Sequence, residues 1–74
     1  MEQEILQIIN AIRSTKGLEQ LSEVRIEDRL REDLDLTSFD LAELTVNIED
    51  KYDIDIFEDG LVNTIGEIYS KLQK

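Results

Sequence analysis

The sequence has no histidine and no cysteine. It therefore lacks the side chains that most often serve as general base, thiol nucleophile and transition-metal ligand. A serine–histidine pair is impossible, and no sequence signature indicates a serine–lysine pair. Two carboxylates acting as acid and base would need a cleft that separates their pKa values, for which a small bundle has little room. We therefore expect no enzyme activity and no catalytic residue.

Proline is absent too, and aromatic residues are few, with two tyrosines and two phenylalanines among 74 residues. The absence of proline is compatible with a mainly helical protein, and an apolar fraction of 41% with so few aromatics indicates an aliphatic core. We expect one domain, residues 1–74, close to the lower size at which a core alone holds a fold. Without disulfides, helix packing must supply the stability.

Basic residues are scarce: 8 Lys and Arg stand against 18 Asp and Glu, and the net charge is −10. Nucleic acids and anionic membrane surfaces attract proteins through Lys and Arg, so neither is an expected partner. The acidic start, Met1 to Glu4, is unlike a secretory signal, and no apolar run is long enough to span a bilayer. We expect a cytoplasmic monomer, beginning at its own start codon, whose partners present basic surfaces.

Apolar residues at helical spacing predict three main helices. The first covers roughly residues 2 to 15, with Arg13 on its polar side, and the second covers about residues 38 to 52. The last helix follows Thr64, which has capping-box spacing to Glu67. The residues expected to face the core are Ile5, Leu6, Ile8, Ile9, Ile12, Leu41, Leu44, Thr45, Ile48, Tyr52, Ile65, Ile68, Tyr69 and Leu72.

Two segments between these helices are irregular. Residues 16 to 37 show no sustained apolar period and are expected to form a long loop, pinned across the bundle by scattered apolar residues. The sequence leaves open whether this loop frames the start of the second helix. A short helical turn is expected near residues 57 to 61. The predicted fold is therefore all-α, a four-helix bundle of three main helices and one short helix, with a long loop between helices 1 and 2.

A calcium loop is the first site that the acidic residues suggest. Asp53, Asp55 and Gly60 superficially match an EF-hand, which needs oxygen ligands at positions 1, 3 and 5 and Glu at position 12. Counting from Asp53, position 5 is Phe57 and position 12 is Thr64. Because these residues cannot supply the required ligands, we expect no dedicated metal site.

The outward stripe of the second helix combines acidic and apolar residues. Its members are Phe39, Glu43, Val46, Asn47 and Asp50. Eight acids and one base occur between residues 40 and 59, and a purely solvated acidic face would account for them. Phe39 and Val46 lie among these acids, however, and an apolar pair rimmed by charge on an exposed helix face indicates a docking surface.

Ser38 lies at the expected start of the second helix, where serine is common as an N-cap. Thr37 already has capping-box spacing to Asp40, so the helix does not need Ser38 as its cap. A phosphate attached to Ser38 would lie at the positive end of the helix dipole, beside unsatisfied backbone amides. Ser38 is therefore interpreted either as a plain cap or as an attachment point.

The run from residue 33 to residue 44, Asp-Leu-Asp-Leu-Thr-Ser-Phe-Asp-Leu-Ala-Glu-Leu, followed by Ile48 to Tyr52 and Ile54 to Ile56, resembles the acyl carrier protein family. That family's pattern is Asp-Leu-Gly-x-Asp-Ser-Leu-Asp-x-x-Glu-Leu, and the resemblance extends over the whole chain. It implies a four-helix bundle with a 4'-phosphopantetheine arm joined to Ser38 through a phosphodiester. The arm's thiol would carry acyl groups as thioesters to partner enzymes.

The resemblance also implies two kinds of partner. A phosphopantetheinyl transferase would load the arm from coenzyme A, using Mg2+. Enzymes that transfer or modify acyl groups would then dock through basic patches. The residues that match the family's docking positions are Phe39, Glu43, Val46, Glu49 and Asp50.

Three residues depart from the family pattern: Asp35 replaces the usual Gly, Thr37 replaces an acid, and Phe39 replaces Leu. Thr37 keeps a capping oxygen without the charge, and Phe39 enlarges the apolar contact beside the arm. These departures favour a specialised fatty-acid, polyketide or related pathway. The peptidyl-carrier variant does not fit, since it has His before the serine. A D-alanyl carrier stays open, as does an unmodified acidic helical interaction module in which Ser38 has no role.

Overall fold

Three helices form the regular part of the molecule. The computed structural model describes residues 2–58 and 60–73, and within them the helices are α1 (Glu2–Thr15), α2 (Ser38–Tyr52) and α3 (Ile65–Leu72). No strand occurs in these ranges. The all-α class, the bounds of the first two helices and the start of the third are therefore confirmed.

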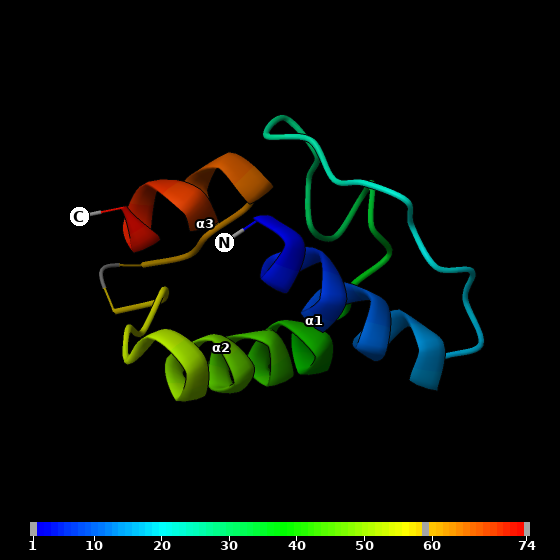
Figure 1. The fold of residues 1–74 in the computed structure, drawn as a ribbon, viewed down its shortest axis with the longest axis horizontal. Coiled ribbons are helices and arrows are strands. Elements are labelled where there is room, and N and C mark those ends of the chain that lie inside the picture. Colours follow the sequence, from blue (N-terminus) through cyan, green and yellow to red (C-terminus); the bar gives the residue numbers. More distant parts are fainter. Residues whose placement is uncertain (1, 59, 74) are drawn as a thin grey trace.

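The first two helices run antiparallel and pack against each other (Figure 1). Near the start of α1, Glu4 accepts a hydrogen bond from the hydroxyl of Tyr52 at the end of α2. Just past the end of α1, Lys16 contacts Asp40 in the first turn of α2. The start of α2 is therefore tied to the end of α1.

Capping boxes begin α2 and α3, as their sequences predict. The Thr37 hydroxyl accepts from the Asp40 amide at 3.2 Å, while the Asp40 carboxylate accepts from the Thr37 amide at 2.8 Å. Thr64 and Glu67 form the same pair of bonds at 3.2 Å and 3.0 Å. Each box satisfies amides that the first helical turn leaves without an acceptor, so both helix starts are well defined.

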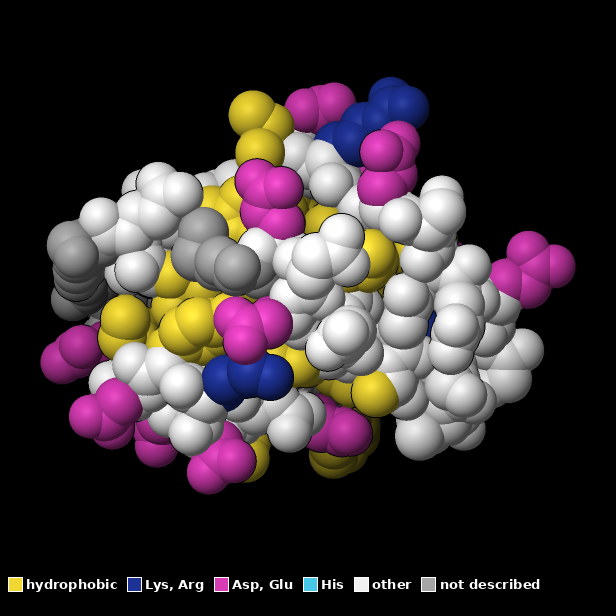
Figure 2. All heavy atoms as spheres, in the orientation of Figure 1, with side chains coloured by type: hydrophobic (Ala, Val, Ile, Leu, Met, Phe, Trp, Pro, Cys, Tyr) yellow, Lys and Arg dark blue, Asp and Glu magenta, His cyan; other side chains and the backbone are white. Residues whose placement is uncertain are grey.

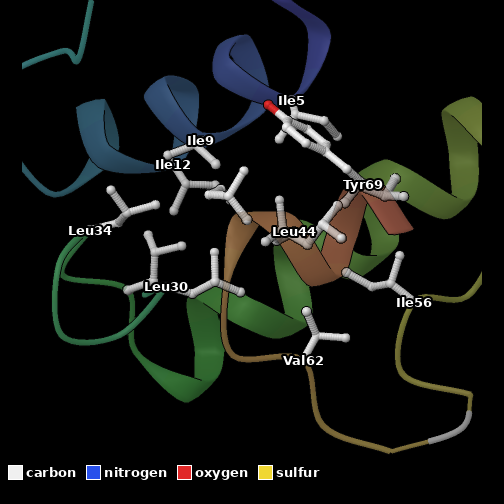
Figure 3. Packing of buried hydrophobic residues seen from close by; sticks show 13 residues of the cluster. Ile5, Ile9, Ile12, Leu30, Leu34, Leu44, Ile56, Val62 and Tyr69 are labelled. Atoms are coloured by element: carbon white, nitrogen blue, oxygen red, sulfur yellow. The ribbon is translucent and has the colours of Figure 1, made fainter. Parts of the chain in front are cut away.

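The aliphatic core lies between the three helices and the long loop. Figure 3 shows Ile12 of α1 on the side of Leu34 and Leu30 of the loop, and Ile5 beside Tyr69 of α3. The buried apolar residues are Ile5, Ile9, Ile12, Leu30, Leu34, Leu36, Leu44, Ile48, Ile56, Val62, Ile65, Ile68 and Tyr69. Predicted core residues that are only partly buried are Leu6, Ile8, Leu41, Thr45, Tyr52 and Leu72.

The long loop, residues 16 to 37, is held by backbone bonds as well as by its buried leucines. It arches from the end of α1 to the start of α3 before it reaches α2 (Figure 1). There the Leu30 amide donates to the Asn63 carbonyl at 2.8 Å, and the Gly66 amide donates to the Ile26 carbonyl at 2.9 Å. A Cβ on Gly66 would lie 3.0 Å from that Ile26 oxygen, so glycine permits the close approach.

The short fourth helix expected near residues 57 to 61 is, in the described residues, a turn over 56–58. Asp59, inside the expected segment, lies outside the described residues. The Asp55 side chain accepts from the Phe57 amide at 2.9 Å, and the Asp55 carbonyl accepts from the Glu58 amide at 3.2 Å. The Asp55 carboxylate thus binds the local backbone, which favours a turn over a helix.

Candidate attachment site at the start of α2

Ser38 is the first residue of α2 and is exposed to solvent. Thr37 is the N-cap, so the interpretation of Ser38 as the cap is wrong. The Ser38 hydroxyl makes no hydrogen bond to any residue of the described ranges. This hydroxyl is therefore accessible and is not used to hold the helix.

Two basic side chains, one in the last turn of α1 and one just past that helix, hold the backbone before Ser38. Arg13 donates from Nη1 to the Leu34 carbonyl at 2.8 Å, and only 7% of Arg13 is exposed. Lys16 donates from Nζ to the Asp35 carbonyl at 2.5 Å and to Asp40 Oδ2 at 2.6 Å. The long loop thus frames the start of α2, which the sequence leaves open.

The burial of Arg13 contradicts its expected place on the polar side of the first helix. Besides Leu34, it donates from Nε to the Glu19 carbonyl at 3.0 Å, so its charge is met by loop carbonyls. A basic residue in the last turn of a helix is a signal for such carbonyl contacts, although it does not say which carbonyls are near.

The carboxylate of Asp40 lies in the same polar network, two positions after Ser38. Burial raises the pKa of Asp40, but the hydrogen bonds from Lys16 and Thr37 outweigh burial and leave its pKa below the usual value. Asp40 is therefore ionised at neutral pH, which suits its position in the first turn of a helix.

Asp35, which replaces the family's usual Gly, adopts a left-handed backbone with φ of 60°. Asp is one of the few residues besides Gly that tolerate this region. The Asp35 carbonyl accepts from Lys16, and its carboxylate lies 3.8 Å from Arg13 Nη1. Asp35 can therefore replace Gly here, because it adopts the left-handed backbone that leads the chain into α2.

A hollow of about 250 Å³ adjoins Ser38. Its lining residues are Arg31, Ser38, Leu41, Ala42, Phe57 and Leu61. Sequence reasoning missed Arg31, Phe57 and Leu61 because they come from irregular segments without an apolar period. Leu61 is 83% exposed, which makes it an apolar edge of this hollow.

A larger hollow, about 320 Å³, lies between α1, the long loop and α3, and none of the predicted site residues lines it.

The outward stripe of α2 is exposed, as the docking hypothesis requires. Phe39 is 89% exposed and Val46 is 67% exposed. The acidic docking candidates Glu43, Glu49 and Asp50 are exposed as well. In Figure 2, Asp and Glu side chains gather along the lower left edge, over the end of α2 and the segment after it. Apolar and acidic side chains thus share one solvent-facing surface.

Two other types of site receive no support from the geometry. Across residues 2–58 and 60–73, no three acidic side chains are grouped so that they could hold a metal ion. In the same ranges, no helix has the length and apolar character needed to cross a membrane.

Comparison with known proteins found relatives that align over nearly the whole chain. No family model and no solved structure matches the chain. The acyl carrier protein of Exiguobacterium sibiricum is 32% identical over 97% of this chain and 92% of its own length. That of Rhodococcus erythropolis is 31% identical over 99% of this chain and 81% of its own length. The meromycolate extension acyl carrier protein of Mycolicibacterium smegmatis is 33% identical over 99% of this chain and 75% of its own length. At this identity and coverage, the chain belongs to the acyl carrier protein family, whose members carry acyl groups and are not enzymes.

Proposed function

We propose that Ser38 bears a 4'-phosphopantetheine arm and that this chain carries acyl groups as thioesters on the arm's thiol. The observation that supports this most directly is an exposed serine with no hydrogen bond from its hydroxyl in the described residues, at a capped helix start. Arg13, Lys16 and the Thr37 cap hold the backbone around it. Such an attachment point keeps one geometry relative to the docking face of α2.

The loading step is a phosphoryl transfer to Ser38. Ser38 Oγ forms a bond to the phosphorus that carries pantetheine in coenzyme A, and its proton passes to the loading enzyme. The pyrophosphate bond breaks, and the adenosine bisphosphate half of coenzyme A leaves. The arm, once bound, supplies the thiol that holds the acyl group, and the chain has no cysteine to compete with it.

The residues around Ser38 fit such an arm. Its phosphodiester would lie at the amino end of a 15-residue helix, where the dipole favours an anion. The hollow beside Ser38 offers apolar side chains, from Leu41, Phe57 and Leu61, for the arm's apolar parts. Both the charge and the apolar surface of the arm therefore find suitable neighbours.

The outward stripe of α2, together with the neighbouring Glu49, is the surface that we propose for enzyme docking. The residues concerned are Phe39, Glu43, Val46, Glu49 and Asp50. Their exposure and the net charge of −10 favour enzymes with basic patches, because opposite charges speed encounter. Phe39 and Val46 add apolar area that a partner could cover.

A specialised fatty-acid, polyketide or related pathway fits the departures at Thr37 and Phe39, which flank Ser38. The name of the Mycolicibacterium smegmatis relative refers to meromycolate extension, which is compatible with a chain-building pathway. The docking enzymes of this chain would then accept an aromatic ring directly after the attachment serine.

The test is loading in vitro with a broad-specificity phosphopantetheinyl transferase, coenzyme A and Mg2+. We expect one phosphopantetheine mass and one titratable thiol per wild-type chain, and neither in Ser38→Ala. Ser70→Ala, which changes another exposed serine, should load like wild type. Absence of loading in a folded wild-type chain, or equal loading of Ser38→Ala, would exclude the attachment site and favour an unmodified interaction module.

A further inference from the structure

Arg31 is unusual among the basic residues of this acidic chain. Side chains that form ion pairs with carboxylates are Arg13, Lys16, Arg25, Arg29 and Lys51. Arg31 makes no ion pair and no side-chain hydrogen bond with any residue in the ranges 2–58 and 60–73. With 18 acids against 8 bases in the sequence, an arginine without a carboxylate partner is unexpected.

The acids nearest to Arg31 in the sequence are used elsewhere. Glu32 lies 3.5 Å from Arg29 Nη1, and Asp33 lies 3.2 Å from Arg29 Nε. Asp33 also accepts from the Arg29 backbone amide at 2.8 Å. Arg29 thus takes both neighbouring carboxylates and leaves the guanidinium of Arg31 without one.

Arg31 belongs to the surroundings of the candidate attachment serine. Arg31 lines the hollow of about 250 Å³ that Ser38 also lines, and among residues 2–58 and 60–73 it is the only charged residue of that lining. The other lining residues besides Ser38 are apolar: Leu41, Ala42, Phe57 and Leu61. A cationic residue therefore lines the same hollow as the serine to which a phosphodiester would be attached.

We propose that Arg31 pairs with the phosphodiester of the arm on Ser38 and holds the root of the arm over this hollow. This inference rests on the proposed function. A guanidinium offers several N–H donors in a planar fork that matches phosphate oxygens, and such charge-assisted bonds are the stronger ones. Arg31 is a positioning residue in this role, since it does not take part in the transfer itself.

The pairing also accounts for an arginine next to a surface that favours basic partners. A free guanidinium near Ser38 would repel a basic patch on a docking enzyme. Once the arm is attached, the phosphodiester neutralises this charge, and the acidic character of the surface around Ser38 is restored. The electrostatic conflict is therefore confined to the unloaded chain.

The experiment compares unloaded and loaded protein by NMR. In the wild type, we expect the Nε–Hε signal of Arg31 to shift on loading, while that of Arg25, an exposed arginine of the same loop that pairs with Glu23, stays in place. In loaded protein, Arg31→Gln should move the 31P resonance of the arm, Arg31→Lys should move it less, and Arg25→Gln should leave it unchanged. Added salt should shrink the difference between wild type and Arg31→Gln, because exposed ion pairs are screened.

The outcomes separate this inference from the proposed function. Full loading by mass, together with an unmoved Arg31 signal and equal 31P resonances in wild type and Arg31→Gln, would overturn the pairing while the attachment at Ser38 stands. Absence of any mass gain in wild type would overturn both. The wild-type Arg31 signal requires no substitution, so the inference can be refuted even if a variant does not fold.

Discussion

Lys16, just past the end of α1, places its Nζ atom 2.6 Å from Oδ2 of Asp40 in the first turn of α2. The same ammonium donates to the carbonyl of Asp35, at the end of the long loop. The side chain of Lys16 is 27% exposed and that of Asp40 is 13% exposed, so water screens the contact only in part. The ammonium of Lys16 thus connects the end of the first helix to the backbone before Ser38 and to a side chain after it.

Removing this ammonium should loosen the start of α2. For Lys16→Met we expect a loss of about 1 kcal/mol in unfolding free energy, because Asp40 and the Asp35 carbonyl lose a charged donor. Thermal unfolding followed by circular dichroism measures the change. The control is Lys51→Met, since Lys51 lies 3.6 Å from Glu4 and is 44% exposed. Equal losses in the two variants would contradict a special role of Lys16.

Asp40 should show a pH dependence of known sign. Its native pKa lies below its ordinary value of 3.8, so ionised Asp40 stabilises the fold above that pH. This contribution is lost as pH falls below 3.8 and through the native pKa, where the native carboxylate also takes up a proton. The stability difference between wild type and Asp40→Asn should therefore be largest at neutral pH and shrink below 3.8. Carboxyl NMR titration tests the pKa directly; a native value above 3.8 would refute the prediction.

Tyr52 should ionise only in strong alkali. Burial, together with the hydrogen bond to Glu4, raises the pKa of Tyr52 to about 12, from an ordinary value of 10.0. The neutral hydroxyl therefore contributes stability that is complete below pH 10 and is lost as pH rises toward 12. Ultraviolet titration of the tyrosinate in a Tyr69→Phe background, which leaves one tyrosine, measures the pKa. Glu4→Gln should lower it, and an unchanged value would show that Glu4 has no part in the shift.

Charge reversal on the outward stripe of α2 should slow the loading enzyme. For Glu43→Lys we expect kcat/KM of the phosphopantetheinyl transferase to fall roughly five- to tenfold, through weaker encounter with a basic patch. Glu27→Lys makes the same charge change at an exposed position of the long loop and should have a smaller effect. If kcat/KM fell by the same factor for both variants, the change in net charge alone would explain the result. A docking face on α2 would then be contradicted.

Gly66 should resist substitution despite its position inside a helix. Alanine normally stabilises a helix interior by up to about 1 kcal/mol over glycine. Here the Cβ of an alanine would lie 3.0 Å from the Ile26 carbonyl oxygen, which accepts a hydrogen bond from the Gly66 amide. We expect Gly66→Ala to lower the unfolding free energy by about 1 kcal/mol, because the loop must shift. Denaturant unfolding checks this, with Ser70→Ala in the same helix as a control that should be neutral or stabilising.

Much of the helical framework could be predicted because its signals are local. A capping box needs only residues three apart, as with Thr37 and Asp40, and an apolar stripe such as Leu44 and Ile48 repeats within one or two turns. The attachment candidate Ser38 follows from the same local pattern. The turn at 56–58 differs from the expected short helix because a single side chain, Asp55, binds the local backbone instead.

By itself, the sequence determined the three helices, the capping boxes of α2 and α3, and the serine at the start of α2. Only the tertiary structure decided what surrounds that serine. The contact between Lys16 and Asp40 joins residues 24 positions apart, and Arg31 meets Ser38 only at a hollow between separate segments. Such contacts depend on how the long loop crosses the bundle, which is set by packing and backbone bonds to α3 and not by any local period.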